Sequence, residues 1–480
     1  MASFSRDSKR SAQSGNPAPR TPPTVALVSL GCPKNLVDSE RMLAGLALGG
    51  FAVTTDPDGA DVAVVNTCAF IDLARAESDE HIDRLEALKR SGRLRHIVVA
   101  GCMAQRYGRS ILERHPQVDA IVGIAERDAL AEVCRTALRG KAKLAAALAR
   151  RWRPARMFGP PPDDRERLRL TPRHYAYLRI SEGCDNRCAY CAIPEIRGPL
   201  RSKPPEQVLA EAEELAADGA KEIIIIGQDT TAYGCDLPGT QLAARLGGRS
   251  GSDSLAQLLA ELRQRIRVPW IRLMYTHPAS FGEDVIAELT AGPPLVPYVD
   301  LPLQHISDPI LASMGRRVTR AEIEALLGRL RRAVPGIAIR TSFIVGYPGE
   351  TEARFEELLE FVEKVQFDHV GVFVYSREPG TRAADLPDQV PPAVARERWD
   401  RLMAAAERLA HAAAARRVGE TLTVLVDGAD ERGRIVARHA GQAPEVDSVV
   451  LLPAGAAAVG EFASARVTGA EGYDLVAQQS

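Results

Sequence analysis

Residues 184 to 191 read Cys184-Asp185-Asn186-Arg187-Cys188-Ala189-Tyr190-Cys191, three cysteines in the spacing C-x3-C-x2-C with no fourth cysteine close by. A structural zinc site is usually closed by four ligands, and its cysteines usually come in C-x2-C pairs. Three thiolates on a [4Fe–4S] cluster instead leave one iron without a protein ligand, and that iron can bind a substrate. The spacing therefore favours a cluster that does chemistry. The alternative is a zinc site completed by a distant ligand.

This run follows the first of six predicted strands, which alternate with helices. Strands are expected at 177–181, 222–227, 270–275, 298–303, 338–345 and 369–375, with helices at 206–217, 255–265, 320–334 and 352–365. Six repeats are too few for a closed eight-stranded barrel. They predict an open, partial (β/α)6 barrel whose site lies at the carboxyl ends of the strands. Cys184, Cys188 and Cys191 would then lie at the mouth of that barrel.

A second set of cysteines is scattered over the preceding segment. Strands are expected at 25–30, 62–66, 97–100 and 120–122, with helices at 36–48, 73–89 and 106–114, a pattern that predicts a doubly wound parallel α/β domain. Cys32, Cys68 and Cys102 each follow one of these strands directly. Because the carboxyl ends of parallel strands share one edge of a sheet, the three thiols are expected to converge on a second metal cluster. Cys134 and Cys235 have no partner at ligand spacing and read as ordinary thiols.

After a long helix at 393–418 the pattern changes to short strands with Gly and Asp turns. Strands at 421–426, 434–438, 448–452 and 462–467 predict a small OB-like β-barrel. The expected division of the chain is a disordered leader at 1–23, an α/β domain at 24–138, a basic linker at 139–169, the partial barrel at 170–407, and the helix end with the small β-barrel at 408–478. The leader also admits an organelle transit peptide as an alternative.

Composition narrows the class of protein. The net charge is −1, and no apolar run reaches the roughly 18 residues that a membrane span needs. Eight cysteines in 480 residues are too few for a disulfide scaffold, so a cytoplasmic protein with reduced thiols is expected. The stretch 139–170 carries ten Lys and Arg against three acids. It reads as a connector, with contact to RNA as the alternative.

Several motifs resemble those of the radical S-adenosylmethionine (SAM) superfamily. The aromatic Tyr190 precedes the last cysteine of the first run, and Gly227-Gln228-Asp229 after the second barrel strand is similar to the superfamily's motif for the SAM amino group. The resemblance implies further SAM contacts at Gln304-His305, at Arg340, expected to pair with the SAM carboxylate, and at Ser342. It implies that the open iron binds SAM and that a 5′-deoxyadenosyl radical is released. No general base is identified.

The order of domains over residues 24–477 resembles the methylthiotransferases, with a last domain of the TRAM type. The resemblance implies two [4Fe–4S] clusters: Cys32, Cys68 and Cys102 would hold the sulfur-delivering cluster, and Cys184, Cys188 and Cys191 the cluster that binds SAM. It also implies an electron donor such as flavodoxin or ferredoxin. The product would carry C–SCH3 in place of an unactivated C–H.

Two motifs resemble the branch of this family that modifies the β-carbon of an aspartate in small-subunit ribosomal protein twelve. They are Ser29-Leu30-Gly31-Cys32-Pro33-Lys34-Asn35-Leu36-Val37-Asp38-Ser39-Glu40 and Gly441-Gln442-Ala443-Pro444-Glu445-Val446-Asp447; Ser448 departs from the usual Gly. The alternatives are the relatives that modify adenosine in tRNA, and a non-catalytic iron–sulfur or zinc scaffold that binds ribosomal components.

The charge of the last domain bears on this choice. Residues 420–480 contain nine acids, four arginines and no lysine, a net charge of about −5. Proteins that grip RNA use basic surfaces, because phosphate contacts dominate their affinity. An acidic domain suits a basic partner such as a ribosomal protein. The alternative is that the acids only aid solubility.

Overall fold

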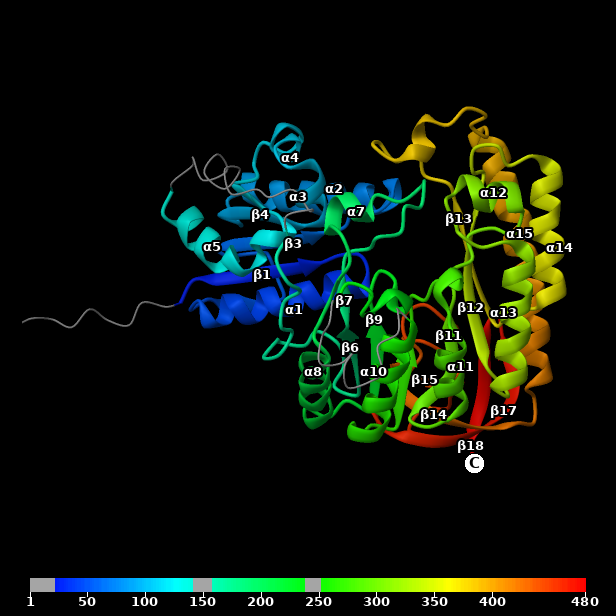
Figure 1. The fold of residues 1–480 in the computed structure, drawn as a ribbon. Helices are drawn as coiled ribbons and strands as arrows, with labels where there is room; N and C mark the ends of the chain where they lie inside the picture. The colour runs from blue at the N-terminus through cyan, green and yellow to red at the C-terminus, as the bar shows by residue number, and fades with distance from the viewer. Residues whose placement is uncertain (1–21, 141–157, 238–251) are drawn as a thin grey trace, which may run out of the picture.

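The computed structural model describes residues 22–140, 158–237 and 252–480 (Figure 1). Residues 1–21 of the predicted leader and 141–157 of the predicted linker lie outside these residues. Three sheets dominate the fold: five parallel strands, six parallel strands, and a closed five-stranded barrel at the C-terminus. The predicted fold class is thereby confirmed. Among the described helices, none combines the length and apolar character required to cross a membrane.

The first sheet has the strand order β2-β1-β3-β4-β5, all parallel. Helices α1 and α5 pack on one face and α2 and α3 on the other, so that every residue of β3 is buried. The elements are β1 (Thr24–Ser29), α1 (Pro33–Leu48), β2 (Ala52–Thr54), β3 (Val62–Thr67), α2 (Asp72–Arg90), β4 (His96–Gly101), α3 (Cys102–Tyr107), α4 (Ser110–Arg114), β5 (Ala120–Val122), η1 (Ile124–Ala129) and α5 (Leu130–Leu138).

Two features of this domain differ from the sequence prediction. The edge strand β2 was not predicted, because three residues are too few to show an alternating pattern. The single helix predicted at 106–114 is two helices, α3 and α4. Gly108 ends α3 with φ = 51°, a left-handed conformation that glycine adopts without steric cost.

The second sheet has the order β13-β12-β11-β10-β9-β6, also all parallel and open at both edges. Its strands are β6 (Tyr175–Arg179), β9 (Glu222–Ile226), β10 (Trp270–Leu273), β11 (Leu295–Asp300), β12 (Ala338–Val345) and β13 (His369–Val374). The outer face is covered by α8 (Pro205–Ala217), α10 (Ser252–Arg265), α11 (Glu283–Thr290), α13 (Arg320–Ala333) and α14 (Glu352–Val365). Between them lie β7 (Ser181–Glu182), α7 (Ile193–Arg197), β8 (Arg201–Ser202), η3 (Thr230–Ala232), η4 (Pro278–Ser280), α12 (Asp308–Ser313) and η5 (Arg382–Asp385).

Helix α15 (Pro392–Arg416) leads to the closed barrel β14-β15-β16-β18-β17. Its strands are β14 (Thr421–Ala429), β15 (Ile435–His439), β16 (Val450–Leu452), β17 (Phe462–Glu471) and β18 (Asp474–Gln479). The last strand was not predicted, since only three of its six residues are apolar and only two are buried. In Figure 1 these red strands lie beneath the green and yellow sheet.

The C-terminal barrel closes the concave face of the six-stranded sheet. Aromatic side chains of that face, Tyr177 and Tyr298 among them, form one buried cluster with Leu425 and Ala443 of the C-terminal barrel. Val37 of α1 belongs to the same cluster. The loop that carries the 441–447 motif is held there by hydrogen bonds, including Tyr298 Oη to Asp447 Oδ2 at 2.8 Å. All three domains therefore meet inside the open barrel.

Buried ion pairs join the first domain to the second. Arg179 of β6 is fully buried and contacts Asp38 of α1 at 2.6 Å and Asp164 at 2.6 Å. Burial alone would raise the pKa of Asp38, but Arg127, Arg179 and Arg197 outweigh it and hold that pKa far below its usual value. The carboxylates stay charged because each faces a guanidinium.

We expect Arg179→Met to lower the free energy of unfolding by about 3–5 kcal/mol, because removal of one partner leaves buried charges uncompensated. Anaerobic urea unfolding at neutral pH measures this. Arg165→Met is the matched control: Arg165 pairs with Asp163 at 2.6 Å, but both side chains are about half exposed, so this substitution should change the free energy of unfolding far less. Equal effects of the two substitutions would contradict the role given to the buried network.

Candidate functional site

The loop of Cys184, Cys188 and Cys191 begins just after β7 at the carboxyl end of β6. Gly183 has φ = 74°, and a Cβ placed on it would lie 1.9 Å from the carbonyl oxygen of Pro199. Only glycine fits this approach, and it lets Cys184 N donate to Gly198 O at 3.1 Å. All three cysteines are unpaired and partly exposed. The loop thus presents three free thiols at the mouth of the barrel.

The thiols of this loop are poorly disposed to ionise alone. Burial raises the pKa of Cys184 to about 12 and also raises the pKa of Cys191, and the neighbouring thiols add to the effect. Arg316 brings a positive charge to the trio, and its Nη1 lies 4.0 Å from Cys188 Sγ. A metal centre supplies the missing positive charge and deprotonates its thiol ligands. The donor set therefore fits a bound cluster.

Three cysteines lie at the carboxyl ends of adjacent strands in the first domain: Cys32, Cys68 and Cys102 follow β1, β3 and β4. Cys32 caps α1, Cys68 follows β3 and Cys102 opens α3. A Cβ on Gly31 would lie 2.7 Å from Cys68 Cβ, so the first two loops touch. Asn35 joins the three loops: its Nδ2 donates to Leu30 O at 2.6 Å and to Asn66 O at 3.2 Å, and Cys102 Sγ lies 3.9 Å from its Oδ1.

Two cations face this trio. Burial opposes ionisation of Cys32, but Lys34, Arg197 and two backbone N–H groups outweigh it and lower its pKa. Burial raises the pKa of Cys102 to about 12 despite Arg197. Arg197 comes from α7, directly after the other cysteine loop, and its Nη2 lies 3.6 Å from Cys102 Sγ. Helix α7 therefore connects the two cysteine trios.

The spacing of the sulfur atoms differs from that of a single-ion site. Among the residues that the structure describes, the group Asp83, Glu86 and His115 is the one that brings three possible metal-ligand atoms within 4.8 Å of one another. Neither cysteine trio does so, although ligands of one zinc ion would. A cluster binds each thiolate to a different iron and tolerates wider spacing. Both trios fit a cluster better than they fit zinc.

The Gly227-Gln228-Asp229 motif lies beside the cysteine loop. Asp229 Oδ2 accepts a hydrogen bond from Asn186 Nδ2 at 2.6 Å. Both polar atoms of the Gln228 amide are buried without a partner, as is Ser181 Oγ. Unsatisfied buried polar groups are costly and rare in folded proteins. A polar ligand such as SAM, bound beside Cys184–Cys191, would supply the hydrogen-bond partners that these atoms lack.

The other predicted SAM contacts lie farther along the sheet. Gln304 has φ = 72°, and its backbone N donates to Ser342 O at 2.9 Å, which places Gln304, in the segment after β11, against β12. Tyr190 packs with Tyr347 and Met314 behind the cysteine loop. His305 is fully buried against Glu350, with its Nε2 3.4 Å from Oε1. His305 therefore has a structural partner.

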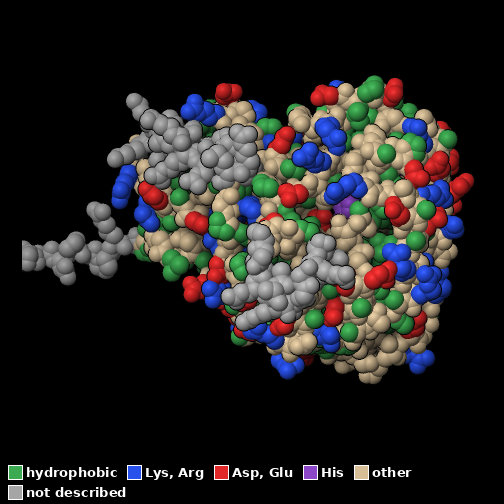
Figure 2. All heavy atoms as spheres, in the orientation of Figure 1, with side chains coloured by type: hydrophobic (Ala, Val, Ile, Leu, Met, Phe, Trp, Pro, Cys, Tyr) green, Lys and Arg blue, Asp and Glu red, His purple; other side chains and the backbone are tan. Residues whose placement is uncertain are grey.

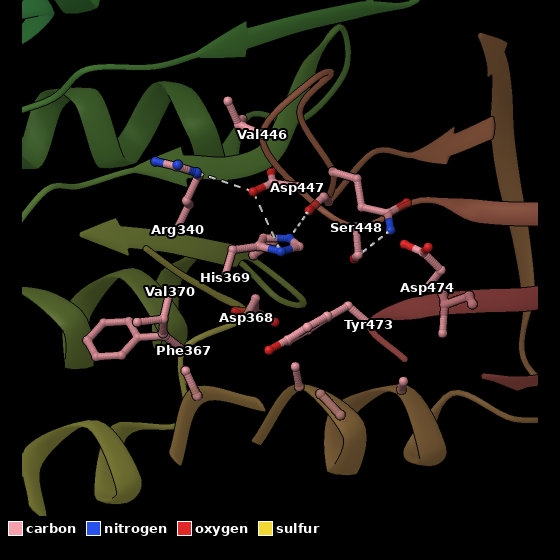
Figure 3. A pocket seen from close by; sticks show the side chains of 18 of the residues that line it. Arg340, Phe367, Asp368, His369, Val370, Val446, Asp447, Ser448, Tyr473 and Asp474 are labelled. Carbon is pink, nitrogen blue, oxygen red and sulfur yellow. Dashed lines mark hydrogen bonds and ion pairs between the residues drawn. The ribbon is translucent and has the colours of Figure 1, made fainter. Parts of the chain in front are cut away.

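Arg340 is placed differently from the sequence interpretation. Its guanidinium pairs with Asp300 at 2.9 Å and with Asp447 of the C-terminal barrel at 3.2 Å. Figure 3 shows it with His369 and Asp447 at a cavity of about 560 Å³ between the sheet, α15 and the C-terminal barrel. Two carboxylates already satisfy this charge, so pairing with the SAM carboxylate does not fit.

The structure reduces the number of linker arginines that are free for the predicted contact with RNA. In the described part of the linker, Arg165, Arg167 and Arg169 pair with Asp163, Glu40 and Asp218 respectively. On the face drawn in Figure 2, basic and acidic side chains of the described residues are interspersed. Of the other basic residues of the linker, Arg139 is described and exposed, and those between 141 and 156 lie outside the described residues. Cys134 is buried in a core, Cys235 is exposed, and neither belongs to a trio.

Sequence reasoning missed Arg316, Arg197, Lys34 and Tyr275 as neighbours of the cysteines. Lys34 is two residues from Cys32, and its type alone was a usable signal. The other three come from loops, helix ends and strand ends whose approach depends on tertiary packing. Tyr275 is notable for φ = 60°, which bulky residues rarely adopt.

Three family models match the chain. The model described as Radical SAM superfamily matches residues 178–362, that of Uncharacterized protein family UPF0004 matches 24–123, and that of the TRAM domain matches 418–479. The radical SAM and UPF0004 matches imply SAM and iron–sulfur clusters as cofactors.

Curated relatives are similar over nearly the whole length. The ribosomal protein uS12 methylthiotransferase RimO of Geobacter sulfurreducens is 43% identical over 456 residues, 95% of this chain and 98% of that protein. Its counterpart in Desulforamulus reducens is 41% identical over 459 residues, 95% and 99% of the two chains. Among solved structures, the radical S-adenosylmethionine methyltransferase TsrM from Kitasatospora setae shares the fold, with a TM-score of 0.51 over 81% of this chain and 89% of that one at 15% identity.

Proposed function

The chain belongs to the ribosomal protein uS12 methylthiotransferase family of the radical SAM superfamily, and we propose that it replaces a hydrogen on the β-carbon of an aspartate in ribosomal protein uS12 with a methylthio group. The observation that carries the proposal is the pair of cysteine trios, held at adjoining edges of two domains and connected by Arg197. Each trio fits a [4Fe–4S] cluster by its donors and spacing.

We assign the SAM-binding cluster to Cys184, Cys188 and Cys191, and the sulfur-delivering cluster to Cys32, Cys68 and Cys102. When bound, the first cluster with SAM supplies a radical that removes the hydrogen, and the second supplies the sulfur. The chain's residues position these groups. Gln228 and Asp229 offer hydrogen-bonding groups to SAM, Gln304 and Ser342 line the adjacent strand exits, and Tyr190 packs behind the loop.

The buried ion pairs of Arg179 and Arg197 hold the two cysteine trios in a fixed position relative to each other. Arg197 contacts Asp38 at 3.0 Å and Glu182 at 3.1 Å, so it is oriented by carboxylates from both domains. A transfer between two sites needs such fixed geometry, because small displacements of reacting groups cost large factors in rate. We therefore expect the two cysteine trios to move little relative to each other.

The partners proposed are the substrate protein and an electron donor such as flavodoxin or ferredoxin. Within the TRAM domain, Asp427, Glu445 and Asp447 face the barrel and bind its residues. Glu420, Glu431, Glu461 and Glu471 remain on the surface. These outer acids support docking of a basic ribosomal protein, and they disfavour RNA binding by this domain.

The rival functions are the modification of adenosine in tRNA and a non-catalytic scaffold. Anaerobically reconstituted protein is expected to hold about eight irons per chain, four in each of two clusters. With reductant and SAM, it should add methylthio groups to purified ribosomal protein uS12 and leave tRNA unmodified, as read by mass spectrometry. Stoichiometric zinc with little iron would point to the scaffold, and a methylthio group on tRNA alone would point to the tRNA enzyme.

A further inference from the structure

Lys34 is a buried cation without a carboxylate partner in the described structure. Its side chain belongs to a residue that is 7% exposed. The other buried lysine, Lys203, contacts Asp164 at 2.7 Å and Glu211 at 2.5 Å. Within the described residues no carboxylate oxygen lies within the 4.0 Å ion-pair distance of Lys34 Nζ. A buried charge is costly unless it is paired. The anion that most favours the ammonium of Lys34 is the Cys32 thiolate, which is assigned to the cluster, so Lys34 has no carboxylate of its own.

The Lys34 ammonium rests instead on an aromatic ring of the other domain. Its Nζ lies 3.1 Å from the centroid of the Tyr275 ring. Tyr275 follows β10 and has φ = 60°. Its backbone N donates to Asp300 Oδ2 at 3.0 Å, and its carbonyl accepts from Thr230 N at 2.9 Å. The fold therefore imposes an unusual backbone conformation that brings this ring under the lysine.

The pair lies beside Cys32, and a chain of contacts joins it to the loop of the other cysteine trio. Lys34 follows Cys32 by two residues on α1. Tyr275 adjoins η3, and Asp229, which precedes η3, is hydrogen-bonded to Asn186 of the other cysteine loop. A ring face covers one side of an ammonium and leaves its N–H donors free for an anion. The pair therefore provides a cation that is held in place and can donate hydrogen bonds to a carboxylate.

Resting on the proposed function, we propose that Lys34 binds the side-chain carboxylate of the substrate aspartate, with Tyr275 holding the ammonium in place. The carboxyl carbon is bonded directly to the β-carbon that is modified, so an anchored carboxylate fixes the reacting C–H. The lysine also selects the substrate. A nucleobase or an asparagine offers no carboxylate, and binding either one would leave Lys34 unpaired.

The test measures binding, in the absence of reductant so that no turnover occurs. Reconstituted enzyme is titrated with uS12 and with uS12 whose target aspartate is changed to asparagine. The wild-type enzyme should prefer the aspartate form by about 10- to 100-fold in Kd, as a charged hydrogen bond provides. In Lys34→Met the two forms should bind within about twofold. Lys34→Arg should keep part of the preference. Lys364→Met is the control and should keep all of it, because the Lys364 side chain is 72% exposed.

Several results would overturn the proposal. They are equal binding of the two forms by the wild-type enzyme, an undiminished preference in Lys34→Met, or loss of iron in both Lys34→Met and Lys34→Gln, which would make Lys34 a support for the cluster. Failure of the proposed function looks different: the wild-type enzyme would bind neither form of uS12 and would instead bind tRNA.

Discussion

Cys188→Ala is expected to reduce the release of 5′-deoxyadenosine from SAM to the background of the assay. Cys188 is the middle ligand of a three-thiolate set with no fourth cysteine nearby, so its loss leaves two ligands for the cluster. Arg316, which faces the Cys188 sulfur at 4.0 Å, cannot replace a thiolate. Anaerobic turnover followed by chromatography measures the nucleoside directly.

The same variant should keep the cluster held by Cys32, Cys68 and Cys102. Its iron content is expected to fall from about eight to about four per chain, because Cys32, Cys68 and Cys102 belong to a separate domain with its own core. Cys235→Ala is the matched control: its thiol is exposed and belongs to neither trio, so both readouts should match the wild type. Continued SAM cleavage by Cys188→Ala would contradict the assignment of the radical-generating cluster to Cys184, Cys188 and Cys191.

Cys68→Ala should give the opposite pattern. Release of 5′-deoxyadenosine continues, since the loop of Cys184, Cys188 and Cys191 is intact. The methylthio product falls to background, because the sulfur-delivering cluster has lost a ligand. Iron again falls by about half. Product mass spectrometry and nucleoside release, measured in one reaction, separate the two activities.

Cys134→Ala provides the control for Cys68→Ala. Both thiols are buried in the first domain, but Cys134 packs in the core between the sheet and α5. Its substitution should leave iron and product unchanged. If Cys68→Ala still formed the methylthio product at the wild-type rate, the sulfur would have another source and the two-cluster account would be wrong.

The pattern of the sequence predicted the sheets well, because buried parallel strands such as Glu222–Ile226 are short apolar runs bounded by helices. The positions of Cys32, Cys68 and Cys102 followed from the shared edge of parallel strands. The residues that surround them did not. Arg197 and Lys34 reach the site from another domain and from a helix start, and their approach depends on how domains pack.

Arg340 illustrates the same limit from the other side. Its place in a strand of the barrel suggested a SAM contact, but the sequence carried no sign that the 441–447 loop would enter the barrel. Asp447 arrives from more than 100 residues away and pairs with it. The C-terminal domain therefore has a structural task inside the barrel, in addition to any docking of the substrate on its outer surface.

The central claim is that this chain modifies ribosomal protein uS12. The most direct measurement is mass spectrometry of uS12 and of tRNA from cells with and without the gene. We predict that uS12 loses the mass of one methylthio substitution in the deletion strain, that the gene restores it, and that tRNA methylthio groups are unchanged. An unaltered uS12 together with loss of the methylthio group from tRNA would contradict the account.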